Sequence, residues 1–167
     1  MAPLGPAPRW LCDEMLARLA RLLRAAGHDT ALAASGMPDR AILETAEREE
    51  RLLLTRDRRL AAAAGARALL IPENDPEEQA RHLARHCGID WNLARFTRCL
   101  MDNALLREAP PEEIAALPLS TRAGPGPFRA CPVCGRIYWP GSHVRRMLDR
   151  LDRLAAAAGT PDPGGRS

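Results

Sequence analysis

Short apolar segments alternate with helical segments along the first half of this chain. The apolar segments cover residues 9–12, 28–33, 52–54 and 67–71. Each is followed by a stretch with hydrophobic residues at helical spacing, and these stretches cover residues 15–26, 39–50, 57–64 and 76–87. Apolar strands that alternate with helices are typical of βαβ units and of a parallel sheet buried on both faces. The sequence therefore predicts an α/β fold with a central, mainly parallel sheet.

Acidic residues stand at three of the predicted junctions between strand and helix. Asp13 and Glu14 follow the first strand, Asp39 opens the second helix, and Asp57 follows the third strand. Side chains at the carboxyl ends of parallel strands converge on one edge of the sheet. Carboxylates are preferred ligands of Mg²⁺ and Mn²⁺, and a metal site of this kind hydrolyses phosphodiesters. We expect Glu14 to bind the metal directly or to orient a metal-bound water.

Each aspartate taken alone also has a structural explanation. Asp39 and Asp57 can both act as helix N-caps, which is a common role of aspartate. The agreement of three positions relative to the sheet is what favours a metal site. Asp75, which follows the fourth predicted strand, is a weaker candidate.

The basic residues are all arginine. The chain has 24 basic residues and no lysine, a net charge of +3 and a pI near 8.8. Arginine binds phosphate bidentately, which suits a nucleic-acid partner, although abundant Ala, Arg, Pro and Gly also point to codon bias. The arginines that we expect to contact RNA phosphates near the metal lie on the first helix or beside Asp57, and they are Arg18, Arg21, Arg24, Arg56, Arg58 and Arg59. As residues of a solvated surface they need no further function.

Four residues in the second half have the spacing of a zinc site. Cys131-Pro-Val-Cys134-Gly forms half of a zinc-ribbon knuckle, and Cys99 with Asp102 matches the other half, with aspartate in place of cysteine. Carboxylate oxygen is an acceptable zinc ligand, so a structural Cys₃Asp site is predicted. His143 is the alternative fourth ligand. The competing interpretations are an empty ribbon and a redox Cys-x-x-Cys pair.

The composition also suggests how the chain is organised. We expect a nuclease domain at residues 9–95, a zinc ribbon at 97–142, a helix at 143–158 that packs back on the nuclease domain, and flexible tails at 1–8 and 159–167. No segment approaches the ~18 apolar residues of a membrane span, and the first residues lack the features of a signal peptide. A cytoplasmic location is therefore expected.

Several motifs occur together and in one order. They are Arg-Trp-Leu-Cys-Asp-Glu, Leu-Leu-Leu-Thr-Arg-Asp, Thr-Arg-Cys, Cys-Pro-Val-Cys and Ile-Tyr-Trp-Pro-Gly-Ser-His. From about residue 9 to residue 154 the chain resembles the PIN-like RNase domain with a zinc ribbon that is known from the C-terminus of Mut-seven exonuclease proteins and from stand-alone prokaryotic proteins.

This resemblance implies a three-layer PIN-like fold and a metal-dependent ribonuclease, with Asp13, Asp39 and Asp57 on the matched acidic positions. Asp102 departs from the family pattern, which has a fourth cysteine there, and this bears on zinc affinity more than on the nuclease chemistry. The resemblance also suggests a functional or packing patch that consists of Tyr138, Trp139, Gly141, Ser142 and His143.

Two points stay open at the level of sequence. His143 is a candidate RNA contact or proton shuttle, and it can equally be a helix N-terminal residue packed against the ribbon. The alternative to an enzyme is a non-catalytic module that binds RNA, or one that binds a protein partner through the zinc ribbon.

Overall fold

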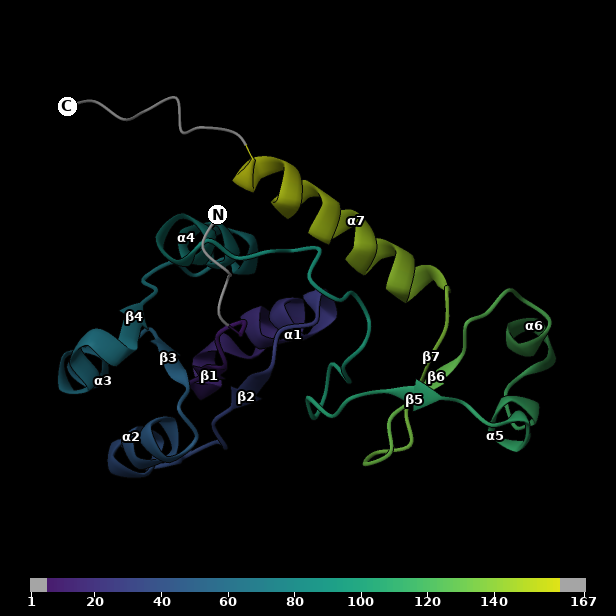
Figure 1. Cartoon of the computed structure of the whole chain (residues 1–167), viewed down its shortest axis with the longest axis horizontal. Helices are drawn as coiled ribbons and strands as arrows, with labels where there is room; N and C mark the ends of the chain where they lie inside the picture. The colour runs from purple at the N-terminus through teal and green to yellow at the C-terminus, as the bar shows by residue number, and fades with distance from the viewer. Residues whose placement is uncertain (1–5, 160–167) are drawn as a thin grey trace.

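The computed structural model describes residues 6–159 and shows two parts that are connected by a long C-terminal helix (Figure 1). In chain order the elements of the first part are β1 (Trp10–Cys12), η1 (Glu14–Leu16), α1 (Ala17–Ala26), β2 (Thr30–Leu32), α2 (Asp39–Arg48), β3 (Leu52–Thr55), α3 (Arg58–Ala64), η2 (Gly65–Arg67), β4 (Ala68–Leu70) and α4 (Pro76–Cys87). The smaller second part contains β5 (Arg107–Glu108), α5 (Pro111–Ala115), α6 (Leu119–Arg122), β6 (Arg129–Ala130) and β7 (Ile137–Tyr138). The C-terminal helix is α7 (Ser142–Ala158).

The sheet of the first part has the strand order β2-β1-β3-β4, and all neighbouring strands are parallel. The predicted α/β fold class is therefore confirmed. The strand predicted at residues 28–33 is shorter than expected and spans Thr30–Leu32, because its partner β1 offers only Trp10–Cys12 for pairing.

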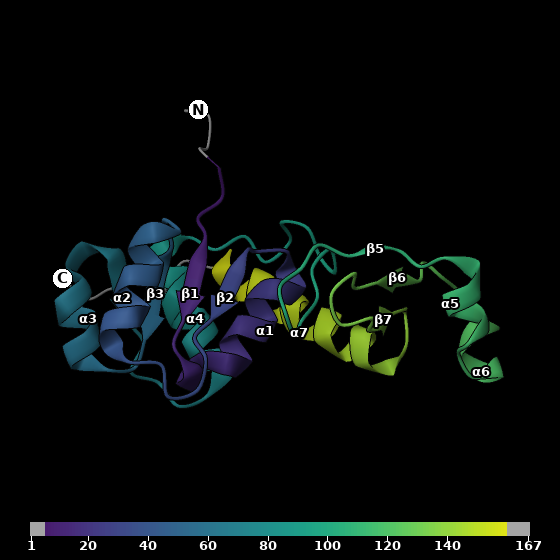
Figure 2. The ribbon, with the colours of Figure 1, turned by 90° about the horizontal axis from the view of Figure 1, so that it is seen from below.

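Alternate residues of the central strands face opposite layers of helices. Trp10, Cys12 and Leu54 belong to a core that they share with α1, α4 and α7. Leu11 and Leu53 belong to a second core with α2 and α3. Since side chains alternate along a strand, both faces of the sheet are apolar. The sheet is the middle of three layers, with α1 and α4 on one side and α2 and α3 on the other (Figure 1), and Figure 2 shows β3, β1 and β2 side by side.

The neighbouring strands β1 and β3 send their following helices to opposite faces of the sheet. Helix α1 packs into the first core, and α3 packs into the second. In open α/β sheets, ligands bind outside the carboxyl ends of strands at the place where the strand order reverses in this way. The residues that follow β1 and β3 therefore occupy this position.

Gly27 ends α1 and lets a distant segment cross the end of the helix. Its φ is +101°, and a Cβ at this position would lie 2.4 Å from the backbone oxygen of Ala94. The crossing segment is fixed by backbone hydrogen bonds from Ala94 to Ala26 (2.9 Å) and from Phe96 to Ala25 (2.9 Å). Residues 91–96 of this segment form turns and bends.

The second part is built on a three-stranded antiparallel sheet in the order β5-β6-β7. The short helices α5 and α6 lie between β5 and β6 in the chain, at the far end of the molecule from the parallel sheet (Figure 1). The Cys-Pro-Val-Cys motif lies between β6 and β7. This arrangement gives the motif the setting of a ribbon knuckle.

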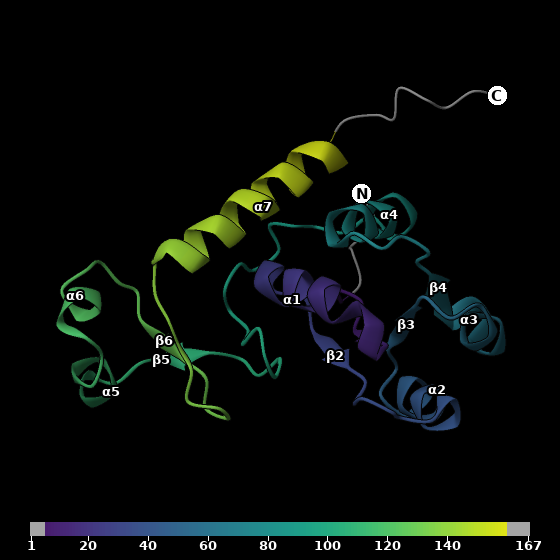
Figure 3. The same ribbon diagram turned by 180° about the vertical axis from the view of Figure 1, so that it is seen from behind.

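Helix α7 starts beside the small sheet and packs against α1 and α4 of the first part (Figure 3). Leu151 and Leu154 are buried in the first core. An ion pair between Arg95 and Asp152 (2.7 Å) adds to the contact. Within residues 6–159, no helix combines the length and the apolar character that a membrane span requires. The predicted tails lie mostly outside the described residues.

Candidate active site and metal centre

Asp13 directly follows β1, and its side chain is held in one orientation by hydrogen bonds. The residue is only 6% exposed. Its Oδ1 accepts a hydrogen bond from the backbone N–H of Met15 at 2.9 Å. Its Oδ2 accepts one from the Thr55 hydroxyl and one from the backbone N–H of Arg56 at 3.3 Å. Because a buried carboxylate requires such donors, these contacts position Asp13 at the carboxyl edge of the sheet.

Thr55, the last residue of β3, links Asp13 to Asp57. Its hydroxyl donates to Asp13 and accepts a hydrogen bond from the backbone N–H of Asp57 at 3.0 Å. Thr55 was not among the predicted site residues, although its position two residues before Asp57 in the Thr-Arg-Asp motif could have indicated a role at the site.

Asp57 is the N-cap of α3. Its Oδ1 accepts hydrogen bonds from the backbone N–H groups of Arg59 (2.7 Å) and Leu60 (3.1 Å). Within residues 6–159 its Oδ2 has no hydrogen-bond partner. The capping role therefore uses one carboxylate oxygen of Asp57 and leaves the other for a further ligand.

Glu14 and Asp39 lie at the same edge of the sheet, on the side of β2. Oε2 of Glu14 accepts a hydrogen bond from the backbone N–H of Gly36 at 3.2 Å, which ties the start of η1 to the loop after β2. Asp39 is the first residue of α2, is exposed, and does not cap the helix, because the N-cap position belongs to Pro38. The cap explanation therefore accounts for Asp57 and does not account for Asp39.

The acidic residues are less tightly grouped than the cysteines. Among the described residues, one group of three or more His, Cys, Asp or Glu side chains has ligand atoms within 4.8 Å of one another, and it contains no residue of the acidic edge. The link between Asp13 and Asp57 runs through Thr55.

The predicted RNA-binding arginines divide into two groups. One group is exposed, and within residues 6–159 its side chains have no hydrogen bond or ion pair; it consists of Arg18, Arg21, Arg58 and Arg59. The guanidinium of Arg56 is engaged by Asn74 and by the backbone oxygen of Pro72 (3.5 Å).

Arg24 is a correction to the sequence prediction. It is 4% exposed and donates hydrogen bonds to the backbone oxygens of Thr30 (2.8 Å) and Leu100 (2.9 Å). The ribbon segment covers α1 at this turn, so Arg24 joins the two parts of the molecule and is not available to RNA.

The second candidate site is the group formed by Cys99, Asp102, Cys131 and Cys134. The Sγ atoms of Cys99 and Cys134 lie 3.7 Å apart, and Sγ of Cys131 lies 3.3 Å from both carboxylate oxygens of Asp102. Two sulfurs that share a tetrahedral zinc at bonds of about 2.3 Å are about 3.8 Å apart, and a sulfur and an oxygen are about 3.5 Å apart. A disulfide requires about 2.05 Å. The donors and their spacing therefore fit a zinc ion.

The two halves of this cluster have the same backbone geometry. The backbone N–H of Gly135 donates to the oxygen of Cys131 at 3.0 Å, and the N–H of Asn103 donates to the oxygen of Cys99 at 3.0 Å. Gly135 has φ +71°, and Asn103 has φ +69°. Asp102 thus occupies in the first knuckle the position that Cys134 occupies in the second.

The ionisation of these donors depends on their mutual contacts. Burial raises the pKa of Cys99, but hydrogen bonds from Tyr138 and from backbone N–H groups outweigh it and leave the pKa below its ordinary value. The backbone N–H of Arg136 lowers the pKa of Cys134, whereas burial and the Asp102 carboxylate raise it, to about 11 overall. A metal that binds here must displace thiol protons, so metal affinity falls at low pH.

The patch suggested by the resemblance adjoins this cluster. The hydroxyl of Tyr138 accepts a hydrogen bond from the backbone N–H of Leu100 at 3.0 Å and lies 3.3 Å from Sγ of Cys99. His143 is the second residue of α7, is exposed, and accepts a hydrogen bond from Arg146 at its Nδ1 (3.1 Å). The supporting role of Tyr138 could not be read from the sequence, because 38 residues separate it from Leu100.

A three-layer α/β domain with carboxylates at one sheet edge and an attached cysteine-rich ribbon is the class of protein that this structure defines. The model of the Mut7-C RNAse domain family matches residues 8–151, and the chain belongs to this family. The predicted resemblance is therefore confirmed. The description of the family indicates ribonuclease activity, with RNA as the substrate. The search of curated proteins and the search of solved structures each found no match.

Proposed function

We propose that this chain is a metal-dependent ribonuclease that hydrolyses RNA phosphodiester bonds at the carboxyl edge of its parallel sheet. The observation that carries the proposal is the linked pair of Asp13 and Asp57, which follow β1 and β3 where their helices leave to opposite faces. Family membership supports the reaction class, and the sheet topology supports the place.

The residues of this edge would have distinct roles. Asp13 and Asp57 would hold a Mg²⁺ or Mn²⁺ ion, because both offer hard carboxylate oxygens and Asp57 keeps one oxygen outside its cap. Asp39 would supply a further oxygen from the start of α2, and Glu14 would hold the loop before α2 through Gly36. Such an ion would lower the pKa of an attacking water and stabilise the leaving oxygen.

The surroundings of this edge would bind the RNA strand and maintain the fold. Arg18 and Arg58 are exposed and have no partner within the described residues, so they are suited to phosphate contacts. A zinc ion held by the Cys₃Asp cluster would have a structural role, because this knuckle packs against α1 through Arg24.

The test is an RNA cleavage assay with the zinc-loaded chain, with and without Mn²⁺. Asp57→Asn is the sharpest variant, because asparagine caps a helix about as well as aspartate and removes only the charge. If a carboxylate–metal contact contributes several kcal/mol to the transition state, kcat falls by about 10² to 10³-fold. Asp13→Asn should have at least the same effect.

Asp90→Asn is the matched control. The Asp90 side chain accepts a hydrogen bond from the backbone N–H of Asn92 at 2.8 Å, in an exposed turn after α4, and asparagine preserves that bond. Cleavage that is equal in Asp57→Asn and in Asp90→Asn would remove the site assignment. RNA binding without any Mn²⁺-dependent cleavage would favour the non-catalytic RNA-binding alternative, and selective capture of a protein partner without RNA affinity would favour an interaction module.

A further inference from the structure

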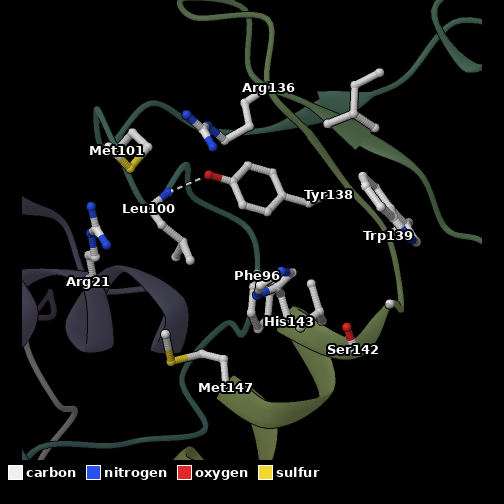
Figure 4. Close-up of a pocket in the computed structure, with 13 residues that line it drawn as sticks. Arg21, Phe96, Leu100, Met101, Arg136, Tyr138, Trp139, Ser142, His143 and Met147 are labelled. Carbon is white, nitrogen blue, oxygen red and sulfur yellow. Dashed lines mark hydrogen bonds between the residues drawn. The ribbon is translucent and has the colours of Figure 1, made fainter. Parts of the chain in front are cut away.

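A pocket of about 490 Å³ lies between the knuckle, the middle of α1 and the start of α7 (Figure 4). This volume lies in the ordinary range for small-ligand sites. Its lining comes from three segments that are far apart in the chain, and it includes Arg21, Phe96, Leu100, Arg136, Trp139 and Met147. The pocket does not overlap the acidic edge, since neither Asp13 nor Asp57 lines it.

Two guanidinium groups face this mostly apolar pocket without a partner. Arg21 and Arg136 are exposed, and within residues 6–159 neither side chain forms a hydrogen bond or an ion pair. His143 adds a third nitrogen-bearing side chain, and the described lining contains no aspartate or glutamate. Figure 4 shows Arg21 and Arg136 on the side of Leu100 and Met101, with Trp139 and Ser142 on the other side. Unpaired arginines above apolar and aromatic side chains call for a ligand that has both an anionic and a flat apolar portion.

Helix α1 leads from the acidic edge to the pocket. The short helix η1 begins just after Asp13 and leads into α1, where Arg18 and Arg21 lie three residues apart on the exposed face. With rises of about 2.0 Å per residue in η1 and about 1.5 Å in α1, the eight residues from Asp13 to Arg21 correspond to roughly 13 Å. Three or four stacked nucleotides cover that length at about 3.4 Å each.

We propose that this pocket binds one nucleotide of single-stranded RNA, three or four nucleotides from the scissile phosphate, with its phosphate on Arg21 and Arg136 and its base against Trp139. The inference rests on the proposed ribonuclease function and adds a substrate subsite to it. The ribbon then serves as part of the RNA-binding surface, because Tyr138 links the wall of the pocket to the knuckle through Leu100 and Cys99.

The first experiment measures binding alone. A fluorescein-labelled oligoadenylate of eight nucleotides is titrated with the zinc-loaded full chain, without Mg²⁺ or Mn²⁺, and anisotropy gives Kd. We expect Arg21→Ala and Arg136→Ala to raise Kd about three- to tenfold each and to reduce the salt slope by about one. Trp139→Leu should raise Kd about tenfold through loss of stacking.

Arg85→Ala is the charge-matched control, because Arg85 is exposed on α4 and does not line the pocket. Arg21 and Arg136 are exposed as well, so their replacement should not disturb folding. Equal Kd values for the wild type, all three pocket variants and Arg85→Ala would overturn the proposal. Absence of any RNA binding by the wild type would overturn it too.

The second experiment separates this subsite from the chemistry. With Mn²⁺, Arg136→Ala should raise KM for the eight-nucleotide RNA and leave kcat/KM for a dinucleotide unchanged, because a dinucleotide is too short to reach the pocket. An unchanged KM for the longer RNA, together with cleavage that still depends on Asp57, would overturn the subsite and leave the proposed ribonuclease standing. Pocket-dependent binding without cleavage would support a nucleotide site in the pocket, and it would defeat the proposed ribonuclease and the placement of the site relative to a scissile phosphate.

Discussion

The two parts of this molecule are stabilised by different means. The parallel-sheet part has two apolar cores, and large side chains such as Trp10, Leu16 and Leu83 are fully buried there. Between residues 97 and 141, the buried apolar side chains are those of Cys99, Ala109, Ala130 and Cys131. Two alanines bury little surface, and the two cysteines belong to the proposed zinc site.

This difference predicts that the fold of the ribbon would depend on a metal bound by the cysteine cluster, whereas the fold of the sheet would not. Small segments without an adequate apolar core require a disulfide or a metal. The described structure contains no disulfide, since Cys12, Cys87, Cys99, Cys131 and Cys134 are all free. The acidic edge therefore belongs to the part with the apolar cores, and the wall of the proposed nucleotide pocket belongs in part to the segment that zinc would organise.

Loss of the metal should produce the largest difference in stability between the two parts. In Cys131→Ser we expect loss of one equivalent of zinc and, with it, loss of the ordered ribbon, since structural zinc contributes about 10 kcal/mol or more in small domains. Hydrogen exchange followed by mass spectrometry should show amides of residues 98–106 and 129–138 unprotected, with β1 and β3 still protected. Cys87→Ser is the control, because Cys87 is exposed and outside the cluster. A metal-free ribbon that keeps full protection would refute the comparison.

The next prediction concerns the contact that joins the two parts. Arg24→Leu removes the donors to the backbone oxygens of Thr30 and Leu100. A buried charged group with hydrogen bonds of this kind contributes on the order of 3 kcal/mol, so the free energy of unfolding should fall by about that amount. Urea denaturation measures the change. Arg21→Leu on the same helix is the control and should change stability by less than about 0.5 kcal/mol, because Arg21 is exposed. Equal effects of the two variants would contradict the buried role of Arg24.

Arg24 also shows where sequence analysis reached its limit. Local signals predicted local features well: the helix predicted at residues 76–87 is α4, Pro76–Cys87, and the helix predicted at residues 15–26 ends where α1 ends, at Ala26. The cysteine cluster followed from short spacings for the same reason. Arg18, Arg21 and Arg24 follow one another at the same spacing, yet only Arg24 is buried. The segment that covers it contains Leu100, which is 76 positions away in the chain, so no local pattern reveals the burial.

The acidic edge was predictable only in part. The positions of Asp13 and Asp57 followed from the order of strands and helices, since the sequence pattern places both after apolar strands. The link through Thr55 depends on the pairing of β1 with β3, which joins residues 42 positions apart, and no local pattern reports it. The wall of the proposed nucleotide pocket could not be predicted for the same reason, because it forms only where the ribbon meets α1 and α7.

A smaller effect is expected from Gly27→Ala, which tests the crossing of α1 by the segment at Ala94. The substitution combines a left-handed backbone with a contact of 2.4 Å to a backbone oxygen, so the free energy of unfolding should fall by about 2 kcal/mol. Gly36→Ala is the matched control, because Gly36 also has a positive φ of +74° but no atom within 4 Å of its Cβ position. It should cost about 1 kcal/mol from backbone strain alone. Chemical denaturation of both variants isolates the contribution of the close approach, and equal losses would show that the segment at Ala94 can move away.

The smallest expected effect comes from making the two knuckles alike. Asp102→Cys places a thiolate where Cys134 has one in the second knuckle, and both loops already have the same backbone hydrogen bond and a left-handed fifth residue. Since thiolate is a softer ligand for zinc than carboxylate, zinc affinity should rise about tenfold in competition with a chromophoric chelator. Asp102→Asn should lower it, because the neutral amide is a weaker donor. If neither variant changes the affinity, the fourth ligand is another group, and His143 becomes the residue to replace. If zinc affinity rises and the rate of RNA cleavage stays unchanged, residue 102 acts on the stability of the ribbon and has no part in the chemistry at the sheet edge.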